Sequence, residues 1–315
     1  MYLSICTGVY GDFSYPDMLD KVKAHGLNHV ELCVGGWGPN PHGYATDLLE
    51  DEDKLKAFKD ELDKRGMEIS AFNCSGNPLA PGPMGEKHSK SAYDTVTLAG
   101  KLGVKTIVMM SGLPAGAPGD KTPNWVVATQ SVPPDYPYLE ETVRYQWEDV
   151  AIPWWKEFAK HADANGVKIA LEEFPGQLVY NVSTLFKLRE AVGPTIGMNL
   201  DPSHLLIMGA DPIASARALG DAIYYVHGKD ARIERGLCDV DGLLDNRHVE
   251  DVAERTWNYV AVGCGQDLKW WKEFFSVLSM VGYKGVVSLE MEDLTMSVEA
   301  GVVTSIDALE ATISK

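Results

Sequence analysis

The chain has 315 residues, of which 45% are hydrophobic, and its 45 acidic and 28 basic residues give a formal net charge of −17 at pH 7. This charge would repel phosphate backbones and argues against a nucleic-acid partner, and no uninterrupted apolar run approaches the ~18 residues of a membrane span. The first residues lack the basic segment and apolar stretch of a secretory signal, so we expect a cytoplasmic protein without a membrane partner.

A helix-to-strand step recurs along the chain. After an opening strand over residues 3–8, a helical stretch ends at a glycine and a short strand follows on seven occasions. The seven glycines are Gly26, Gly66, Gly103, Gly166, Gly193, Gly220 and Gly282. Each suits the left-handed position that closes a helix, where a Cβ atom would be strained. The pattern therefore predicts eight strands.

Helices are expected between these strands. Apolar residues at three- and four-residue spacing predict helices over residues 15–26, 51–66, 88–103, 138–166 and 267–282, and Asp267 is placed to cap the last of them. Parallel strands need helical crossovers, so the alternation predicts an α/β fold, a (β/α)8 TIM barrel. Since a barrel of this kind takes ~250 residues, we expect residues 1–315 to form a single domain with enlarged loops at the C-terminal rim.

Two connections are longer than a minimal barrel needs. One runs from Ser111 to Tyr138 and the other from Lys229 to Gln266. Connections above ~15 residues in a compact domain are often lids or contact surfaces. A surface insertion or an oligomer contact explains the first connection equally well. We expect the second to contribute to the site because it begins beside His227.

Four of the predicted strands end on residues that bind metals. Glu172, Asp201, His227 and Glu290 follow their glycines by six to eight residues. At ~3.3 Å per residue, these offsets place all four at the C-terminal rim, where the chemistry of TIM barrels is found. Three carboxylates there would repel one another without a cation, and oxygen ligands with one imidazole suit Mn²⁺, Mg²⁺, Co²⁺ or Fe²⁺. Glu173 should point away by strand alternation.

Each ligand also has a simpler explanation. Glu172 or Glu290 could belong to a buried ion pair, Asp201 could cap the turn before Pro202, and His227 could be a core histidine. The shared register of the four strand ends favours a single divalent-metal site over four separate coincidences.

Four segments resemble a known family. Residues 167–175 (VKIALEEFP), 197–209 (GMNLDPSHLLIMG), 224–233 (YYVHGKDARI) and 285–293 (GVVSLEMED) are similar to the fifth to eighth strands of the xylose isomerase-like superfamily. This superfamily of sugar phosphate isomerases/epimerases includes ketose 3-epimerases, dehydratases and endonuclease IV, and the resemblance spans essentially the whole chain. It implies that Glu172, Asp201, His227 and Glu290 bind one divalent metal, with Mn²⁺ favoured over Mg²⁺ or Co²⁺, and that the two glutamates are the catalytic acid/base groups.

Four further residues are candidates for substrate binding. His204 resembles a family histidine that contacts substrate oxygens, although it could also start a helix and face solvent. Lys229 could contact substrate, support the charge of His227 or form an ordinary salt bridge. Trp37 and His42 could form a wall for stacking a sugar, or they could simply pack.

The resemblance implies a sugar or keto-sugar substrate and a homo-oligomer, and it leaves an accessory subunit open. The leading expectation is an isomerase or epimerase that removes the proton α to a carbonyl through a metal-stabilised enediolate. The alternative is a lyase, either a dehydratase or a subunit that cleaves 3-keto-glycosides or C-glycosides. Leu178 and Ile233 replace an acidic residue and an arginine of the ketose 3-epimerases, which argues against 3-epimerisation of free ketohexoses. A non-catalytic sugar-binding barrel would not need two glutamates beside the metal.

Overall fold

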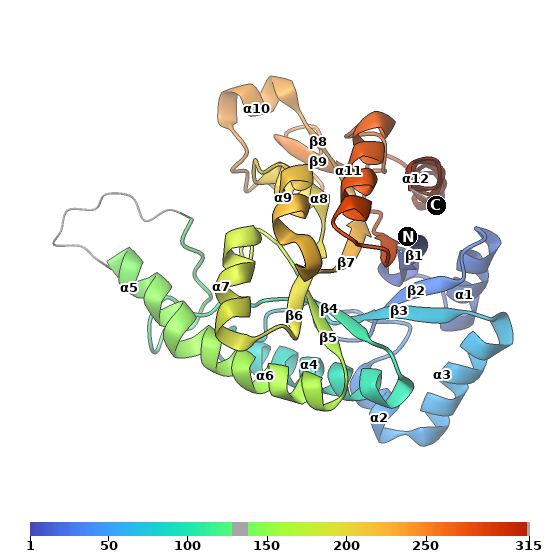
Figure 1. Ribbon diagram of the computed structural model, residues 1–315, viewed down its shortest axis with the longest axis horizontal. Coiled ribbons are helices and arrows are strands. Elements are labelled where there is room, and N and C mark those ends of the chain that lie inside the picture. Colours follow the sequence, from blue (N-terminus) through green and yellow to red (C-terminus); the bar gives the residue numbers. More distant parts are fainter. Residues whose placement is uncertain (128–137, 314–315) are drawn as a thin grey trace.

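Eight parallel strands close into a barrel, as Figure 1 shows for the computed structural model, which describes residues 1–127 and 138–313. Their order around the barrel is β1-β10-β7-β6-β5-β4-β3-β2. The strands are β1 (Tyr2–Cys6), β2 (His29–Cys33), β3 (Glu68–Asn73), β4 (Thr106–Met110), β5 (Lys168–Glu172), β6 (Ile196–Leu200), β7 (Ile223–Gly228) and β10 (Val286–Leu289). The predicted (β/α)8 barrel is confirmed.

Helices surround the barrel. They are α1 (Tyr15–Ala24), α2 (Ala45–Glu50), α3 (Glu52–Arg65), α4 (Pro83–Leu102), α5 (Tyr138–Arg144), α6 (Ile152–Ala164), α7 (Val182–Val192), α8 (Pro202–Ile207), α9 (Pro212–Leu219), α11 (Leu268–Met280) and α12 (Val298–Thr312). The helix predicted over residues 138–166 consists of α5 and α6 joined by a π-helical segment, Tyr145–Ala151. None of the helices in the described parts of the chain is long and apolar enough to cross a bilayer.

The seven glycines that follow the helices all have positive φ angles, which glycine adopts without the strain of a Cβ atom. Gly66 and Gly103 adopt the predicted left-handed conformation, but Gly193 and Gly220 do not. Gly193 has φ 118° and ψ 178° because the following proline disfavours helical ψ at the residue before it. Gly220, with φ 55° and ψ −122°, begins a 3₁₀ turn. The prediction of the local conformation was wrong at these two positions, although both still need glycine.

The second long connection contains regular structure that the sequence did not predict. An antiparallel pair of strands, β8 (Asp230–Ile233) and β9 (Trp257–Val260), carries α10 (Arg235–Asp241) between them. The Asp230 carboxylate accepts backbone N–H groups of Gly263, Gly265 and Gln266 and so ties the end of this ribbon to its beginning. The ribbon lies close to α8, at the end of the barrel where β7 finishes (Figure 1). Of the first long connection, residues 128–137 lie outside the described residues.

Helix α11 is an example of how an outer helix is capped and packed. Asp267 caps it as predicted, since its carboxylate accepts the Trp270 N–H at 2.8 Å. Trp271 and Phe274 are fully buried on the barrel-facing side, whereas Leu268 is 48% exposed.

We expect Phe274→Ala to lower the free energy of unfolding by about 3–5 kcal/mol because it removes a fully buried ring and leaves a cavity. Leu268→Ala on the same helix should change it by less than about 0.5 kcal/mol. Urea unfolding followed by circular dichroism measures both. Equal losses in the two variants would contradict this packing of α11.

Candidate metal centre

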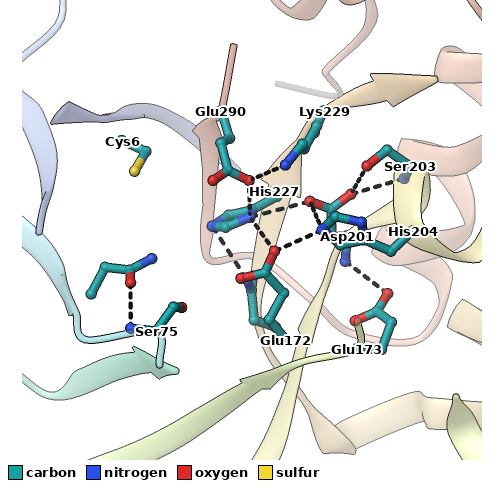
Figure 2. Close-up of polar contacts among 12 residues, drawn as sticks. Cys6, Ser75, Glu172, Glu173, Asp201, Ser203, His204, His227, Lys229 and Glu290 are labelled. Carbon is teal, nitrogen blue, oxygen red and sulfur yellow. Dashed lines mark hydrogen bonds and ion pairs between the residues drawn. The ribbon is translucent and has the colours of Figure 1, made fainter. Parts of the chain in front are cut away.

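The four predicted ligands meet at the C-terminal rim of the barrel. Glu172 is the last residue of β5, Asp201 follows β6 as the N-cap of α8, His227 is in β7, and Glu290 follows β10. Strands β5, β6, β7 and β10 are consecutive neighbours in the barrel, so their ends are close together. Figure 2 shows the four side chains turned toward one another.

The group with metal-ligand spacing differs in one member from the predicted set. Ligand atoms of Glu172, Asp201, His204 and Glu290 lie within 4.8 Å of one another. The Nε2 atom of His204 is 2.8 Å from Glu172 Oε1 and 3.5 Å from Asp201 Oδ2. His204 is fully buried rather than facing solvent. The structure therefore brings the residue predicted to bind substrate in among the candidate metal ligands.

His227 faces the same carboxylates from the other side. Its Nδ1 atom is 3.2 Å from Glu290 Oε2, 3.3 Å from Asp201 Oδ2 and 3.9 Å from Glu172 Oε1. Two imidazoles, those of His204 and His227, thus lie beside three buried or nearly buried carboxylates. These residues form a possible metal site, in which either histidine could complete the set.

Sequence analysis did not find the residue that orients His227. Glu31 is completely buried in β2, and its Oε2 atom lies 3.1 Å from His227 Nε2. Asn73 donates a hydrogen bond of 2.7 Å to the other oxygen of Glu31. A carboxylate behind a ligating histidine fixes the ring and its tautomer. An acid between the apolar residues Val30 and Leu32 was the available signal, because a buried charge needs a partner.

The carboxylates respond differently to this environment. Burial, together with the nearby charge of Glu290, raises the pKa of Glu172. Burial would also raise the pKa of Glu290, but Lys229 and His227 outweigh it and hold that pKa well below its usual range. Burial is likewise outweighed at Asp201, whose pKa falls to about 2 because of His204, His227 and Lys229. Among these three carboxylates, Glu172 therefore has the least charge compensation when no metal ion is bound.

Lys229 supplies the remaining positive charge. Its buried Nζ atom lies 2.9 Å from Glu290 Oε2 and 2.6 Å from Glu292 Oε2, and 4.5 Å from the centre of the Tyr259 ring. The Tyr259 hydroxyl is in turn 2.9 Å from His204 Nδ1. Lys229 therefore forms salt bridges, as one of its predicted roles required. One of its partners is the candidate metal ligand Glu290, and neither partner is His227.

A cavity of about 520 Å³ opens beside these residues. Glu172, Glu290 and Lys229 line it, as does Trp37, whose side chain is 45% exposed. His42, the other predicted wall residue, does not line the cavity. It is buried, with its ring 6.4 Å from that of Tyr15.

Glu173 points away from the cavity, as strand alternation requires. It is completely buried, and its Oε1 atom accepts the backbone N–H of Asp201 at 3.0 Å. It is not in the group with metal-ligand spacing. Its observed contact is thus with the backbone that carries Asp201.

With this fold and this rim, the chain belongs to the xylose isomerase-like TIM barrel family, whose model matches residues 19–312. It is 58% identical over 316 residues to the uncharacterized protein YfiH of Bacillus subtilis (strain 168), and the match covers all of both chains. Among solved structures it is similar to the probable 3-DHS dehydratase AsbF from Bacillus anthracis (TM-score 0.66, 17% identity, 100% of both chains). It is also similar to D-psicose 3-epimerase from Clostridium cellulolyticum H10 (TM-score 0.62, 16% identity, 99% of this chain and 98% of the other).

In metal-free protein near pH 7, we expect Glu172→Gln to leave the free energy of unfolding unchanged or to raise it. The raised pKa of Glu172 means that ionising it costs folding free energy, and this cost grows as the pH rises through its folded-state pKa. Glu290→Gln should instead lower the free energy of unfolding by about 1–3 kcal/mol, because an ion-paired acceptor is lost. Urea unfolding in EDTA tests the pair, and the opposite ranking would contradict this charge balance.

Proposed function

We propose that this protein is a divalent-metal-dependent sugar isomerase or epimerase that removes the proton α to a carbonyl group. The observation that carries the proposal is the position of two glutamates, Glu172 and Glu290, in one group with metal-ligand spacing at the wall of a cavity. A carboxylate placed beside an electron-withdrawing group such as a metal ion can remove a proton next to a carbonyl.

The donor set fits a divalent metal ion. Three carboxylates and the His204 imidazole are buried or nearly so around one point, where the carboxylates repel one another unless a cation stands between them. Oxygen ligands with nitrogen favour Mn²⁺, with Mg²⁺ or Co²⁺ as alternatives. Glu172, Asp201, His227 and Glu290 would hold the ion, with His204 within reach. When bound, the ion would polarise the substrate carbonyl.

The two glutamates can move protons on different sides of a substrate. Glu172 ends β5 and Glu290 follows β10, and β6 and β7 lie between these strands. Each glutamate has a hydrogen-bonding partner, His204 for Glu172 and Lys229 for Glu290. One carboxylate accepts the α-proton. Return of a proton from the other gives an epimer if it reaches the same carbon, and an aldose–ketose isomer if it reaches the neighbouring carbon.

The remaining substrate contacts come from the cavity wall. Trp37 offers an exposed aromatic face, and Lys229 lies beside Glu290. His204 is hydrogen-bonded to Tyr259, which also lines the cavity. We do not extend this role to His42, which lies outside the cavity. We further propose that the protein acts in the cytoplasm as a homo-oligomer on a sugar or keto-sugar. This proposal also allows an accessory subunit that covers the rim.

A lyase is the second candidate, and a specific observation supports it. Leu178 is buried, and neither Leu178 nor Ile233 lines the cavity, so the two polar contacts expected of a ketohexose 3-epimerase are missing there. The same proton abstraction expels a leaving group that is β to the carbonyl. A dehydratase, or an enzyme that cleaves a 3-keto-glycoside or C-glycoside, would therefore use the same glutamates.

We expect the protein to bind one Mn²⁺ per chain, measured by titration calorimetry after treatment with EDTA. Metal at ~1,000 times its dissociation constant should stabilise the fold by about 4 kcal/mol. Asp201→Asn should remove most of the binding, because it weakens a buried ligand. Asp307→Asn, the same change on the exposed face of α12, should bind like the parent protein. Binding that survives Asp201→Asn would contradict the site.

We expect the Mn²⁺-loaded protein to wash deuterium from D₂O into one carbon of its substrate, in a panel of ketoses and 3-keto-glycosides followed by NMR. Glu172→Gln and Glu290→Gln should each slow the exchange by about 10²–10⁴-fold, whereas Glu310→Gln on α12 should not. A new isomer identifies an isomerase or epimerase, and release of water or a fragment identifies a lyase. Full exchange in both site variants would contradict the roles of the glutamates.

A further inference from the structure

The cavity beside the metal centre has an excess of acidic groups. Glu172, Glu290 and Glu292 line it, and Lys229 is the basic residue that the described part of the chain contributes to its wall. Asp201 lies directly behind, within the group with metal-ligand spacing. Four carboxylates outweigh one lysine and one divalent ion, so the cavity keeps a negative charge even when a metal is bound.

The one lysine is already fully engaged. Lys229 is buried and lies between Glu290 and Glu292, at 2.9 and 2.6 Å. Turning toward a phosphate group would break both ion pairs, and Glu290, whose side chain is largely buried, would then depend on His227 for its charge compensation. The position of Lys229 therefore suits charge compensation within the wall better than the binding of an anion.

Two arginines of the connection after β7, Arg232 and Arg255, are the next candidates for binding an anion. Arg232 donates two hydrogen bonds to Glu234, at 3.0 and 2.7 Å. The guanidinium group of Arg255 lies 4.0 Å from the centre of the Trp257 ring. Neither arginine lines the cavity. The bidentate guanidinium fork that commonly holds a phosphate is thus missing from the described wall.

The polar groups of the wall suit hydroxyl groups instead. Among the described residues, Ser75 Oγ and Gln177 Oε1 are buried atoms without a hydrogen-bond partner, and both side chains line the cavity. Figure 2 shows Ser75 across the site from Glu172 and His227. Asn40 and Asn73 add amide groups to the wall, and Trp37 adds an exposed indole. A sugar hydroxyl both donates and accepts, so it suits a wall of amide, hydroxyl and indole groups, whereas a phosphate group only accepts when fully ionised.

From these observations we infer that the cavity takes an uncharged, polyhydroxylated ketone and discriminates against its phosphorylated counterpart. This inference rests on the proposed function, which it narrows to unphosphorylated substrates. The discrimination is electrostatic: like charges brought together across a binding site lower affinity more than neutral contacts raise it.

Affinities of matched ligand pairs test the inference without requiring turnover. The pairs are dihydroxyacetone and its phosphate, D-fructose and its 6-phosphate, and D-xylulose and its 5-phosphate. Their dissociation constants are measured on the Mn²⁺-loaded full-length protein through the water-proton relaxation of the metal. We expect each phosphate ester that binds to do so about tenfold or more weakly than its parent ketose. Phosphates that bind as tightly as their parents, or neutral ketoses none of which bind, would overturn the inference.

The variant Glu292→Lys should improve the binding of phosphate esters relative to their parent ketoses. Reversing this charge in the wall should narrow the gap between phosphate and parent ketose by about tenfold, because a partly exposed cation then faces the cavity. Glu273→Lys on the outer face of α11 makes the same change in net charge away from the cavity and should leave the gap unchanged. An unchanged gap in Glu292→Lys, or an equal change in both variants, would overturn the inference.

The deuterium exchange experiment separates this inference from the proposed function. Exchange confined to phosphorylated sugars would support the proposed reaction and overturn the preference for neutral substrates. Neutral ketoses that bind selectively but exchange no proton and release no fragment would support the preference and overturn the reaction.

Discussion

Repulsion among Glu172, Asp201 and Glu290 is the constraint around which the C-terminal rim is organised. The barrel brings these carboxylates together because β5, β6 and β10 end at the same level, separated only by β7. Burial makes their charges more costly, since the surrounding dielectric no longer weakens them. The neighbouring residues can be understood as the means by which the folded chain tolerates this group before a cation binds.

Residues in two parts of the molecule compensate the negative charge of these carboxylates. Within the barrel, Glu31 on β2 lies behind His227 and keeps that imidazole directed at Asp201 and Glu290. Above the barrel, the β8–β9 ribbon provides Tyr259, which contacts His204 and lies under the ammonium group of Lys229. The long connection after β7 is therefore part of the site, as its starting point suggested. The compensation is incomplete at Glu172, which is consistent with a cation as the missing component.

The sequence predicts those parts of the fold in which the same physical cause, a helix that ends at a glycine, repeats along the chain. A helix must end, a glycine relieves the strain, and a parallel strand follows, so the register of Glu172, Asp201 and Glu290 could be derived from their distance to Gly166, Gly193 and Gly282. The β8–β9 ribbon had no such cause, because each strand has four residues and its ends are held by buried carboxylates, those of Asp230 and Asp293. Its existence depends on tertiary contacts that no local pattern records.

The choice between histidines shows a second limit of sequence reasoning. Strand ends can be aligned, so His227 was found, but the direction of a side chain in the turn after a strand depends on its partners. His204 turns inward because Glu172 and Tyr259 hold its two ring nitrogens. His42 turns away because its loop packs it beside Tyr15. Position in the barrel is therefore encoded locally, whereas membership of the site is decided by pairs of residues far apart in the chain.

Under the proposed function, reaction chemistry and substrate selection would be carried by different parts of this rim. The strand ends supply the carboxylates, which serve any reaction that begins by removing a proton next to a carbonyl, whether it ends as an epimerisation, an isomerisation or an elimination. The connections supply Trp37, Gln177 and Glu292, which line the cavity and, under the proposed function, would select what reaches those carboxylates. A shared barrel with 16–17% identity can thus host both an epimerase and a probable dehydratase. Under the proposed function, the substrate of this chain would therefore be selected by its loops, which contribute acidic and neutral polar groups to the cavity wall.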